Sequence, residues 1–356
     1  MIISRIRQLD FYLIFSVLAI AAIGLLSIYS SNPHLFLRQL AFIVIGLGVM
    51  ILVSFVDWRS FRDNPYFVLV FYFFSVTLLL GLFFFAPVIR DVQRWYSVGP
   101  ILVDPAEIAK LALIILLAKF FSTRYVEMYR ISHILLSAFY AGIPTLLIFR
   151  QPDLGSALIL LIVWAGMLLV SGVKLKHFAV LCLAGVVVFS MGWALFLEDY
   201  QKDRVVSFMQ PDLDPQGIGW GQTQAKIAVG NGGLFGEGFA AGSQTQHGFL
   251  PFPHTDYIFA AIAEEFGLLG VSLLLLLFAF FFWRIVLLIL RSRTNFPRLF
   301  AYGFLIVIFT QMFINIGMNL GMMPIIGTPL PLVSYGGSSI LFVFAGIGIL
   351  QSMRRI

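Results

Sequence analysis

The chain has 356 residues, of which 60% are hydrophobic and only 11% are charged, and its mean hydropathy is +0.97. Apolar runs of about 17 to 25 residues recur along it, and each is long enough to cross a hydrocarbon core of about 30 Å. These values exclude a soluble globular protein. The formal charge of +6 does not indicate a nucleic-acid partner, because the basic residues lie scattered between apolar runs and form no patch.

The apolar runs predict an all-α polytopic membrane protein with ten transmembrane helices in one domain, residues 1–356. The expected spans are residues 11–30, 38–56, 66–86, 106–122, 132–149, 154–172, 176–197, 257–290, 298–322 and 337–353. The first run is too long for the core of a signal peptide, so we expect it to remain as the first helix. The single cysteine, Cys182, lies within an apolar run, and we interpret it as a small buried side chain.

Basic residues are distributed unequally between alternate loops. Thirteen lie on the side of the two termini, whereas only Arg38, Arg90, Arg94 and Arg150 lie on the opposite side, apart from those in the long loop at 198–256. Because cytoplasmic loops carry the excess of Lys and Arg, we expect cytoplasmic termini and an external long loop between the seventh and eighth spans. The external segments 87–105 and 323–336 are expected to be interfacial or re-entrant.

The long loop contains the most polar stretch of the chain, residues 213–256, and ends with Asp256 directly before the eighth span. Its glycines match neither a dinucleotide-binding nor a phosphate-loop spacing, so we exclude a nucleotide-binding fold. Asp212 and Asp214 are interpreted as turn residues before Pro215. The five histidines have no metal-ligand spacing.

Several ionisable residues lie at membrane depth on the external side. A charge near the centre of a spanning helix costs about 2.5 to 3.5 kcal/mol, so each must be paired, hydrated or functional. Glu107 and Lys110 share one helix face, and we expect them to meet Asp153, Asp256 and Glu264 in one external cavity. We predict an intramembrane ion pair between Lys110 and Asp153.

Three features of the predicted helices need interpretation. Asp256 is either the N-cap of the eighth span or a functional carboxylate. Glu264 and Glu265 point about 100° apart, so one of them is expected to hydrogen-bond another helix. Ser334, Ser338 and Ser339, next to Gly336 and Gly337, indicate a helix start, and a helix N-terminus that faces an anion is the sharper alternative.

Two segments, 250–270 and 323–339, closely resemble signatures of the SEDS family, which comprises RodA, FtsW and SpoVE. The resemblance extends over nearly the whole chain through residues 105–110, 150–157 and 214–238. Lys226 and the run at 243–246 are similar to the RodA branch. Phe252 stands where the family commonly has an acidic residue, so a role for that carboxylate is not transferred to this chain.

The resemblance implies a peptidoglycan glycosyltransferase that polymerises lipid II at the outer face of the bacterial cytoplasmic membrane during cell elongation, and so serves cell wall biogenesis and cell shape. It also implies a class B penicillin-binding protein as partner. Asp256 falls on the family's essential loop aspartate, and Glu107, Lys110 and Asp153 fall on family positions. The partner's membrane helix is expected to contact Phe278, Phe280, Phe281 and Phe282 of the eighth span.

The implied reaction joins a sugar 4-hydroxyl to an anomeric carbon that carries a pyrophosphate. It needs one base for the hydroxyl, and cations or a metal for the departing anion. We assign the base to Asp256, and a divalent cation held by Asp256 is left open as a cofactor. The candidate substrate-binding residues are Glu107, Lys110, Arg94, Arg204, Gln224, Lys226, His254 and Ser334.

Two other classes of function remain open from the sequence. A lipid II flippase would also need ten spans and buried charges, although the polar residues here gather at one face and not at the midplane. A scaffold that only recruits cell-wall enzymes would not require Asp256.

Overall fold

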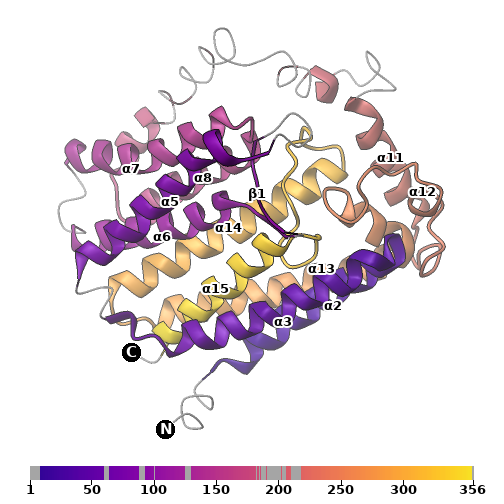
Figure 1. The fold of residues 1–356 in the computed structure, drawn as a ribbon, viewed down its shortest axis with the longest axis horizontal. Helices are drawn as coiled ribbons and strands as arrows, with labels where there is room; N and C mark the ends of the chain where they lie inside the picture. The colour runs from indigo at the N-terminus through magenta and orange to yellow at the C-terminus, as the bar shows by residue number, and fades with distance from the viewer. Residues whose placement is uncertain are drawn as a thin grey trace.

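The computed structural model describes residues 9–59, 64–87, 93–99, 101–124, 130–181, 206–209 and 218–354, together with positions 183, 185, 190 and 202. Helices make up most of this chain (Figure 1). They are α2 (Phe11–Ser31), α3 (Pro33–Phe55), α5 (Pro65–Phe85), α6 (Pro105–Thr123), α7 (Ile131–Arg150), α8 (Leu154–Val170), α11 (Ile218–Asn231), α12 (Ser243–Gln246), α13 (Ile258–Arg291), α14 (Asn295–Asn319) and α15 (Gly337–Met353).

Six of the described helices are long and apolar enough to cross a membrane, namely α2, α3, α5, α7, α13 and α14. Helices α8 and α15 are apolar but shorter. Together with α6, which carries Glu107 and Lys110, these helices coincide with nine of the ten predicted ranges. The remaining range, 176–197, lies mostly outside the described residues, as do Cys182, Asp212 and Asp214.

The first and last described segments meet at one end of the helix bundle (Figure 1). Asp10, the N-cap of α2, donates its backbone N–H to Oε1 of Gln351 at 2.8 Å and accepts a bond from Nε2 of Gln351 at 3.2 Å. The carboxylate of Asp10 pairs with Arg284 of α13. Helices α11 and α12 lie at the opposite end of α13 (Figure 1), so the polar loop is far from the termini.

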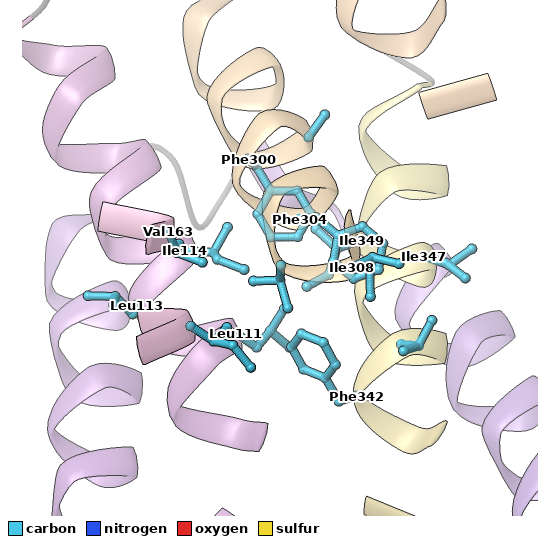
Figure 2. Close-up of a cluster of buried hydrophobic side chains, with 14 of the residues drawn as sticks. Leu111, Leu113, Ile114, Val163, Phe300, Phe304, Ile308, Phe342, Ile347 and Ile349 are labelled. Atoms are coloured by element: carbon cyan, nitrogen blue, oxygen red, sulfur yellow. The ribbon is translucent and has the colours of Figure 1, made fainter. Parts of the chain in front are cut away.

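Helix α14 passes through the middle of the bundle and supplies much of its core (Figure 2). Phe300, Phe304 and Ile308 of this helix are completely buried and belong to one cluster with Ile114 of α6 and Val163 of α8. A helix that is apolar on several faces is expected in the interior of a membrane protein. The end of α14 at Asn319 is therefore attached to a well-packed rod.

Two irregular segments lie between the helices. The first contains a short antiparallel hairpin of β1 (Tyr96–Val98) and β2 (Ile101–Val103), which the all-α prediction did not anticipate. The hydroxyl of Tyr96 donates to the carbonyl of Leu78 in α5 at 2.7 Å. The second segment, 321–336, has no helix, and Thr328 and Val333 within it are buried. Protein covers parts of both segments, since Asp104 next to the hairpin and residues 330–334 of the second segment are buried, whereas Leu102 and Met322 are exposed.

Helix α13 is broken at Gly267, where φ is 63° and ψ is −163°. Glycine adopts this positive φ without steric cost. The glycine-rich segment after α11 fills the break, because the N–H of Glu237 donates to the carbonyl of Glu264 at 2.8 Å and the N–H of Leu268 donates to the carbonyl of Gly233 at 2.9 Å. The glycines of the long loop thus serve close backbone packing.

Candidate functional site

A cavity of about 770 Å³ lies where the long loop meets α13. Its walls come from the end of the long loop, the hairpin, the irregular segment 321–336, the starts of α6, α8 and α15, and α3. The polar and aromatic lining includes Arg38, Arg94, Trp95, Asp104, Glu107, Asp153, Phe252, His254, Thr255, Asp256, Tyr335, Ser338 and Ser339. The cavity therefore brings together five of the residues predicted from the sequence to bind substrate, to act as the base or to form the ion pair, namely Arg94, Glu107, Asp153, His254 and Asp256.

Asp256 does not occupy the N-cap position of α13. The helix begins at Ile258, and its N-cap residue is Tyr257, whose side chain makes no capping hydrogen bond. Asp256 instead lines the cavity, and Oδ2 of its carboxylate would lie 3.9 Å from a Cβ atom added at Gly327. The N-cap interpretation of Asp256 is therefore wrong, and its carboxylate belongs to the cavity wall.

The backbone that carries Asp256 is held in place by hydrogen bonds that other segments donate to three consecutive carbonyl groups, those of residues 254–256. The carbonyl of His254 accepts from the N–H of Tyr335 at 2.8 Å, and that of Thr255 accepts from Oγ of Ser334 at 2.7 Å. The carbonyl of Asp256 accepts from Nδ2 of Asn315 at 3.1 Å and from Nδ2 of Asn319 at 2.9 Å.

Sequence reasoning missed both asparagines. The available signal was their spacing of four residues near the end of an otherwise apolar helix, which places two amides on one face. Ser334 was a candidate for substrate binding, but the structure gives it a structural role. It is buried, is not among the cavity-lining residues, and its hydroxyl also accepts from the N–H of Leu330 at 2.8 Å.

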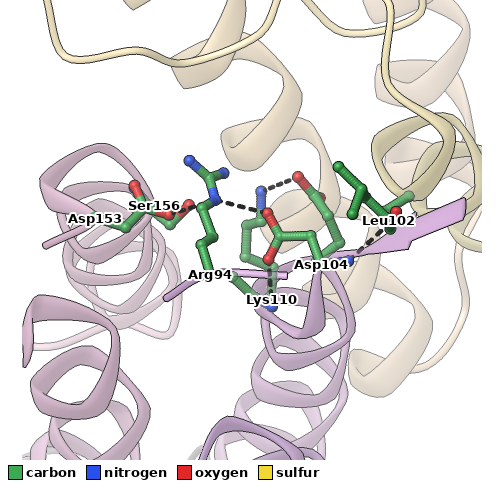
Figure 3. A network of polar contacts seen from close by, with 9 residues as sticks. Arg94, Leu102, Asp104, Lys110, Asp153 and Ser156 are labelled. Atoms are coloured by element: carbon green, nitrogen blue, oxygen red, sulfur yellow. Dashed lines mark hydrogen bonds and ion pairs between the residues drawn. The ribbon is translucent and has the colours of Figure 1, made fainter. Parts of the chain in front are cut away.

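Arg94 links two of the acidic residues in the cavity wall (Figure 3). Its Nε lies 2.8 Å from Oδ2 of Asp104 and 3.1 Å from Oδ2 of Asp153. Burial lowers the pKa of this guanidinium, but the two carboxylates outweigh burial, and the net effect raises its pKa above the ordinary value. Figure 3 shows the two terminal nitrogens of Arg94 directed away from both carboxylates, so they are available to an anion in the cavity.

Lys110 does not form the predicted ion pair with Asp153. Its Nζ lies 2.8 Å from Oε1 of Glu107, which precedes it by three residues on α6 and is therefore within easy reach on the same face. Asp153 caps α8 by accepting from the N–H of Ser156 at 3.1 Å, and its other oxygen pairs with Arg94. Arg94 therefore pairs with Asp104 and Asp153, and Lys110 pairs with Glu107. The cation beside Asp153 is Arg94 and not the predicted Lys110.

The remaining candidates from the long loop lie away from the cavity. Lys226 is exposed, and its stem packs on Gly321, where an added Cβ would approach Cδ of Lys226 to 2.7 Å. Gln224 is buried and does not line the cavity. Gln222 makes the bonds in this region, since its Nε2 donates to the carbonyl of Met323 at 2.8 Å. Arg204 lies outside the described residues.

The two neighbouring glutamates of α13 have different partners. Glu264 was expected in the cavity, but it accepts from the N–H groups of Gln244 at 2.6 Å and Thr245 at 3.0 Å and so holds α12. Glu265 accepts from the hydroxyl of Ser30 in α2, which confirms that one of the two hydrogen-bonds another helix. Both carboxylates are used to fix the loop and the bundle.

The N-terminus of α15 opens on the cavity, because Gly336, Gly337, Ser338 and Ser339 all contribute to its wall. The free N–H groups and the dipole at a helix N-terminus attract anions. Arg38 of α3 also lines the cavity and was not singled out in the sequence. Among the described residues no cluster of three His, Cys, Asp or Glu could hold a metal ion, and a divalent cation at Asp256 stays a prediction.

The phenylalanines expected to contact a partner helix are divided between the core and the surface. Phe278 and Phe281 are buried in the main hydrophobic cluster, and Phe282 packs against Phe309 with ring centroids 5.7 Å apart. The exposed apolar side chains of this part of α13 include Leu273 and Trp283. The expectation that Phe278 and Phe281 face a partner is wrong because both point into the bundle.

The family model described as a cell cycle protein of the FtsW, RodA and SpoVE type matches residues 2–356. The peptidoglycan glycosyltransferase MrdB of Escherichia coli (strain K12) is 34% identical over 351 residues, which cover 98% of this chain and 94% of MrdB. Stage V sporulation protein E of Bacillus subtilis (strain 168) is 34% identical over 367 residues and covers 97% of each chain.

Two solved structures have the same fold. A chain of a peptidoglycan synthase complex, described as coordinating polymerization and crosslinking, superposes with a TM-score of 0.85 at 31% identity over 98% of both chains. The rod shape determining protein RodA of Thermus thermophilus superposes with a TM-score of 0.73 at 28% identity, covering 98% of this chain and 97% of RodA. This chain therefore belongs to the SEDS family of FtsW, RodA and SpoVE proteins.

Proposed function

We propose that this protein is a peptidoglycan glycosyltransferase that polymerises lipid II into glycan strands during cell elongation. One observation carries the proposal: the carboxylate of Asp256 shares a cavity with Arg38, Arg94 and the N-terminus of α15. That arrangement combines one base with several positive groups. The similarity to MrdB, which is named a peptidoglycan glycosyltransferase, supports the same activity.

In the proposed mechanism, Asp256 takes the proton from the 4-hydroxyl of the acceptor sugar. The oxygen then forms a bond to the anomeric carbon of the donor, while the bond from that carbon to the pyrophosphate oxygen breaks and the configuration inverts. The leaving undecaprenyl pyrophosphate keeps the electron pair. Arg38, Arg94 and the N-terminus of α15 stabilise its charge. A second carboxylic acid is not needed, in contrast to glycoside hydrolysis, because pyrophosphate leaves without protonation.

The proposed topology has ten spans in one domain of residues 1–356, cytoplasmic termini, and an external loop at 198–256. The bonds between Asp10 and Gln351 support it by joining the start of α2 to the end of α15, as an even number of crossings requires. The cavity then faces the outer side of the membrane, and its apolar wall, which includes Leu35, Phe42 and Ile45 of α3, suits the lipid tail of the substrate.

A class B penicillin-binding protein is the proposed partner, and its membrane helix is proposed to contact the apolar surface of α13 and α14. The support is the solved peptidoglycan synthase complex, in which polymerization and crosslinking are coordinated. Because Phe278 and Phe281 are buried, the proposed contact surface consists of exposed side chains, namely Leu269, Leu273, Trp283, Phe309 and Phe313.

Purified protein in detergent, with and without its partner, tests the proposal on lipid II. Detergent leaves no bilayer for a flippase to cross, whereas a polymerase still joins its substrates. Glycan strands longer than the substrate, separated by gel electrophoresis, are the expected product. If no polymer forms with the partner present, but the protein moves lipid II across vesicle membranes, the flippase is correct. If neither activity is found, the scaffold is the better account.

A further inference from the structure

The buried asparagines Asn315 and Asn319 lie at the end of α14 and contact the loop that carries Asp256. Both side chains are completely buried. Nδ2 of each donates to the backbone carbonyl of Asp256, which thereby uses both of its lone pairs. A buried amide without a partner is unfavourable, so these bonds fix the carbonyl in one place.

Asn319 also caps the first turn of α13. Its Oδ1 accepts from the N–H of Ala260 at 3.1 Å, which is one of the donors left without an intrahelical partner at a helix start. The N-cap residue Tyr257 supplies no side-chain bond there. The capping role thus belongs to a residue of another helix, and the side chain of Asp256 is directed to the cavity instead.

Asn315 connects the same carbonyl to the irregular segment on the far side of the cavity. Its Nδ2 donates to the carbonyl of Thr328 at 2.8 Å as well as to that of Asp256. Neighbouring Gly327 approaches the carboxylate of Asp256 and lines the cavity. The two amides therefore hold the start of α13 and one wall of the cavity in a fixed relation.

We infer that Asn315 and Asn319 are positioning residues for the glycosyl transfer, because they set the place of the Asp256 carboxylate through its backbone. The inference rests on the proposed function of Asp256 as base. Helix α14 is anchored in the core by Phe300 and Phe304, so the amides form a rigid support. Misplacing a catalytic group by about 1 Å can lower a rate by about 100-fold.

The matched control is Gln311, one turn further into the same helix. It is completely buried like the asparagines, but neither polar atom of its side chain has a hydrogen-bond partner. The change Gln311→Leu removes a buried amide from α14 without touching the loop at 254–256. Replacing an unpaired amide with an apolar group is expected to be neutral or stabilising.

The test compares Asn319→Leu, Gln311→Leu and the wild type in lipid II polymerisation, with equilibrium binding of labelled lipid II measured on the same samples. We expect Asn319→Leu to lower kcat about 100-fold, with KM, the dissociation constant and the binding stoichiometry of lipid II within about 3-fold of the wild type. Gln311→Leu should polymerise like the wild type. In the background of Asp256→Asn, Asn319→Leu should add no further loss.

A misfolded variant lowers the binding stoichiometry, which separates it from a positioning effect. If Asn319→Leu does not fold, Asn319→Asp keeps the size and the acceptor for Ala260 but replaces the amide donor, and the same loss of kcat is expected. If the wild type polymerises lipid II and folded Asn319 variants have the same kcat, the positioning role is overturned and the proposed function stands. A wild type that makes no polymer overturns the proposed function as well.

Discussion

Nε of Arg94 lies 3.1 Å from Oδ2 of Asp153, so a residue next to the β1–β2 hairpin is bound to the N-cap of α8. The same nitrogen contacts Asp104, the N-cap of α6. One guanidinium thus ties together three segments that form a wall of the cavity (Figure 3). Its remaining nitrogens stay available for an anion, which gives Arg94 both a structural and a substrate-binding role in this account.

The change Arg94→Gln should destabilise the protein by about 3 kcal/mol, because it leaves two buried carboxylates without their cation. Thermal unfolding in detergent measures this loss. The double variant Arg94→Gln with Asp153→Asn should recover part of it, since one of the two stranded charges is removed. Equal unfolding temperatures for wild type and Arg94→Gln would contradict the assigned pairing.

The pairing of Lys110 can be tested by comparing two double variants. Lys110→Met leaves Glu107 as a buried charge without a partner, and we expect it to lower stability by about 3 to 5 kcal/mol. Adding Glu107→Gln should restore much of the stability, whereas adding Asp153→Asn should not. Thermal unfolding of the wild type, the three single variants Lys110→Met, Glu107→Gln and Asp153→Asn, and the two double variants gives the coupling energies. Stronger rescue by Asp153→Asn would restore the original prediction of a pair between Lys110 and Asp153.

The glycine-rich segment next to the break in α13 should be sensitive to a single methyl group. A Cβ atom at Gly236, where φ is +81°, would lie 2.2 Å from the carbonyl oxygen of Glu265. Gly236→Ala should therefore separate the segment from the break, lower the unfolding temperature and increase cleavage of the loop by proteases. Gly230→Ala is the control, because nothing lies within 4 Å of an added Cβ there. It should be neutral or stabilise α11 by up to about 1 kcal/mol.

Accessibility labelling tests the proposed topology. His247 and Arg293 are exposed and lie near opposite ends of α13. After replacement of Cys182, a cysteine in place of His247 should react with an impermeant reagent in intact cells. A cysteine in place of Arg293 should react only after lysis. The reverse pattern would place the cavity on the cytoplasmic side and would contradict both the orientation and the proposed site of polymerisation.

The sequence predicted the helices well because hydropathy is a local property. The predicted spans at 11–30 and 337–353 agree with α2 and α15 to within one residue at each end. The special position of Asp256 could also be predicted, since it lies where a polar loop meets a long apolar run. The helix start near Ser338 was likewise a local signal.

Pairings between segments could not be predicted, because hydropathy does not determine how each helix is rotated about its axis. The sequence therefore assigned Asp153 to Lys110, when the hairpin brings Arg94 to Asp153. It also gave no indication that Asn319, far along the chain, caps the helix that follows Asp256. Both relations depend on tertiary packing.

The polymerisation rate of folded Asp256→Asn decides whether Asp256 is the base. Asparagine keeps the size of the side chain and an oxygen that can accept a hydrogen bond, but it is not a base. We expect a rate about 10²- to 10⁴-fold below that of the wild type, with lipid II binding retained. A folded Asp256→Asn protein that makes glycan strands at the wild-type rate would contradict the assignment of Asp256 as the base.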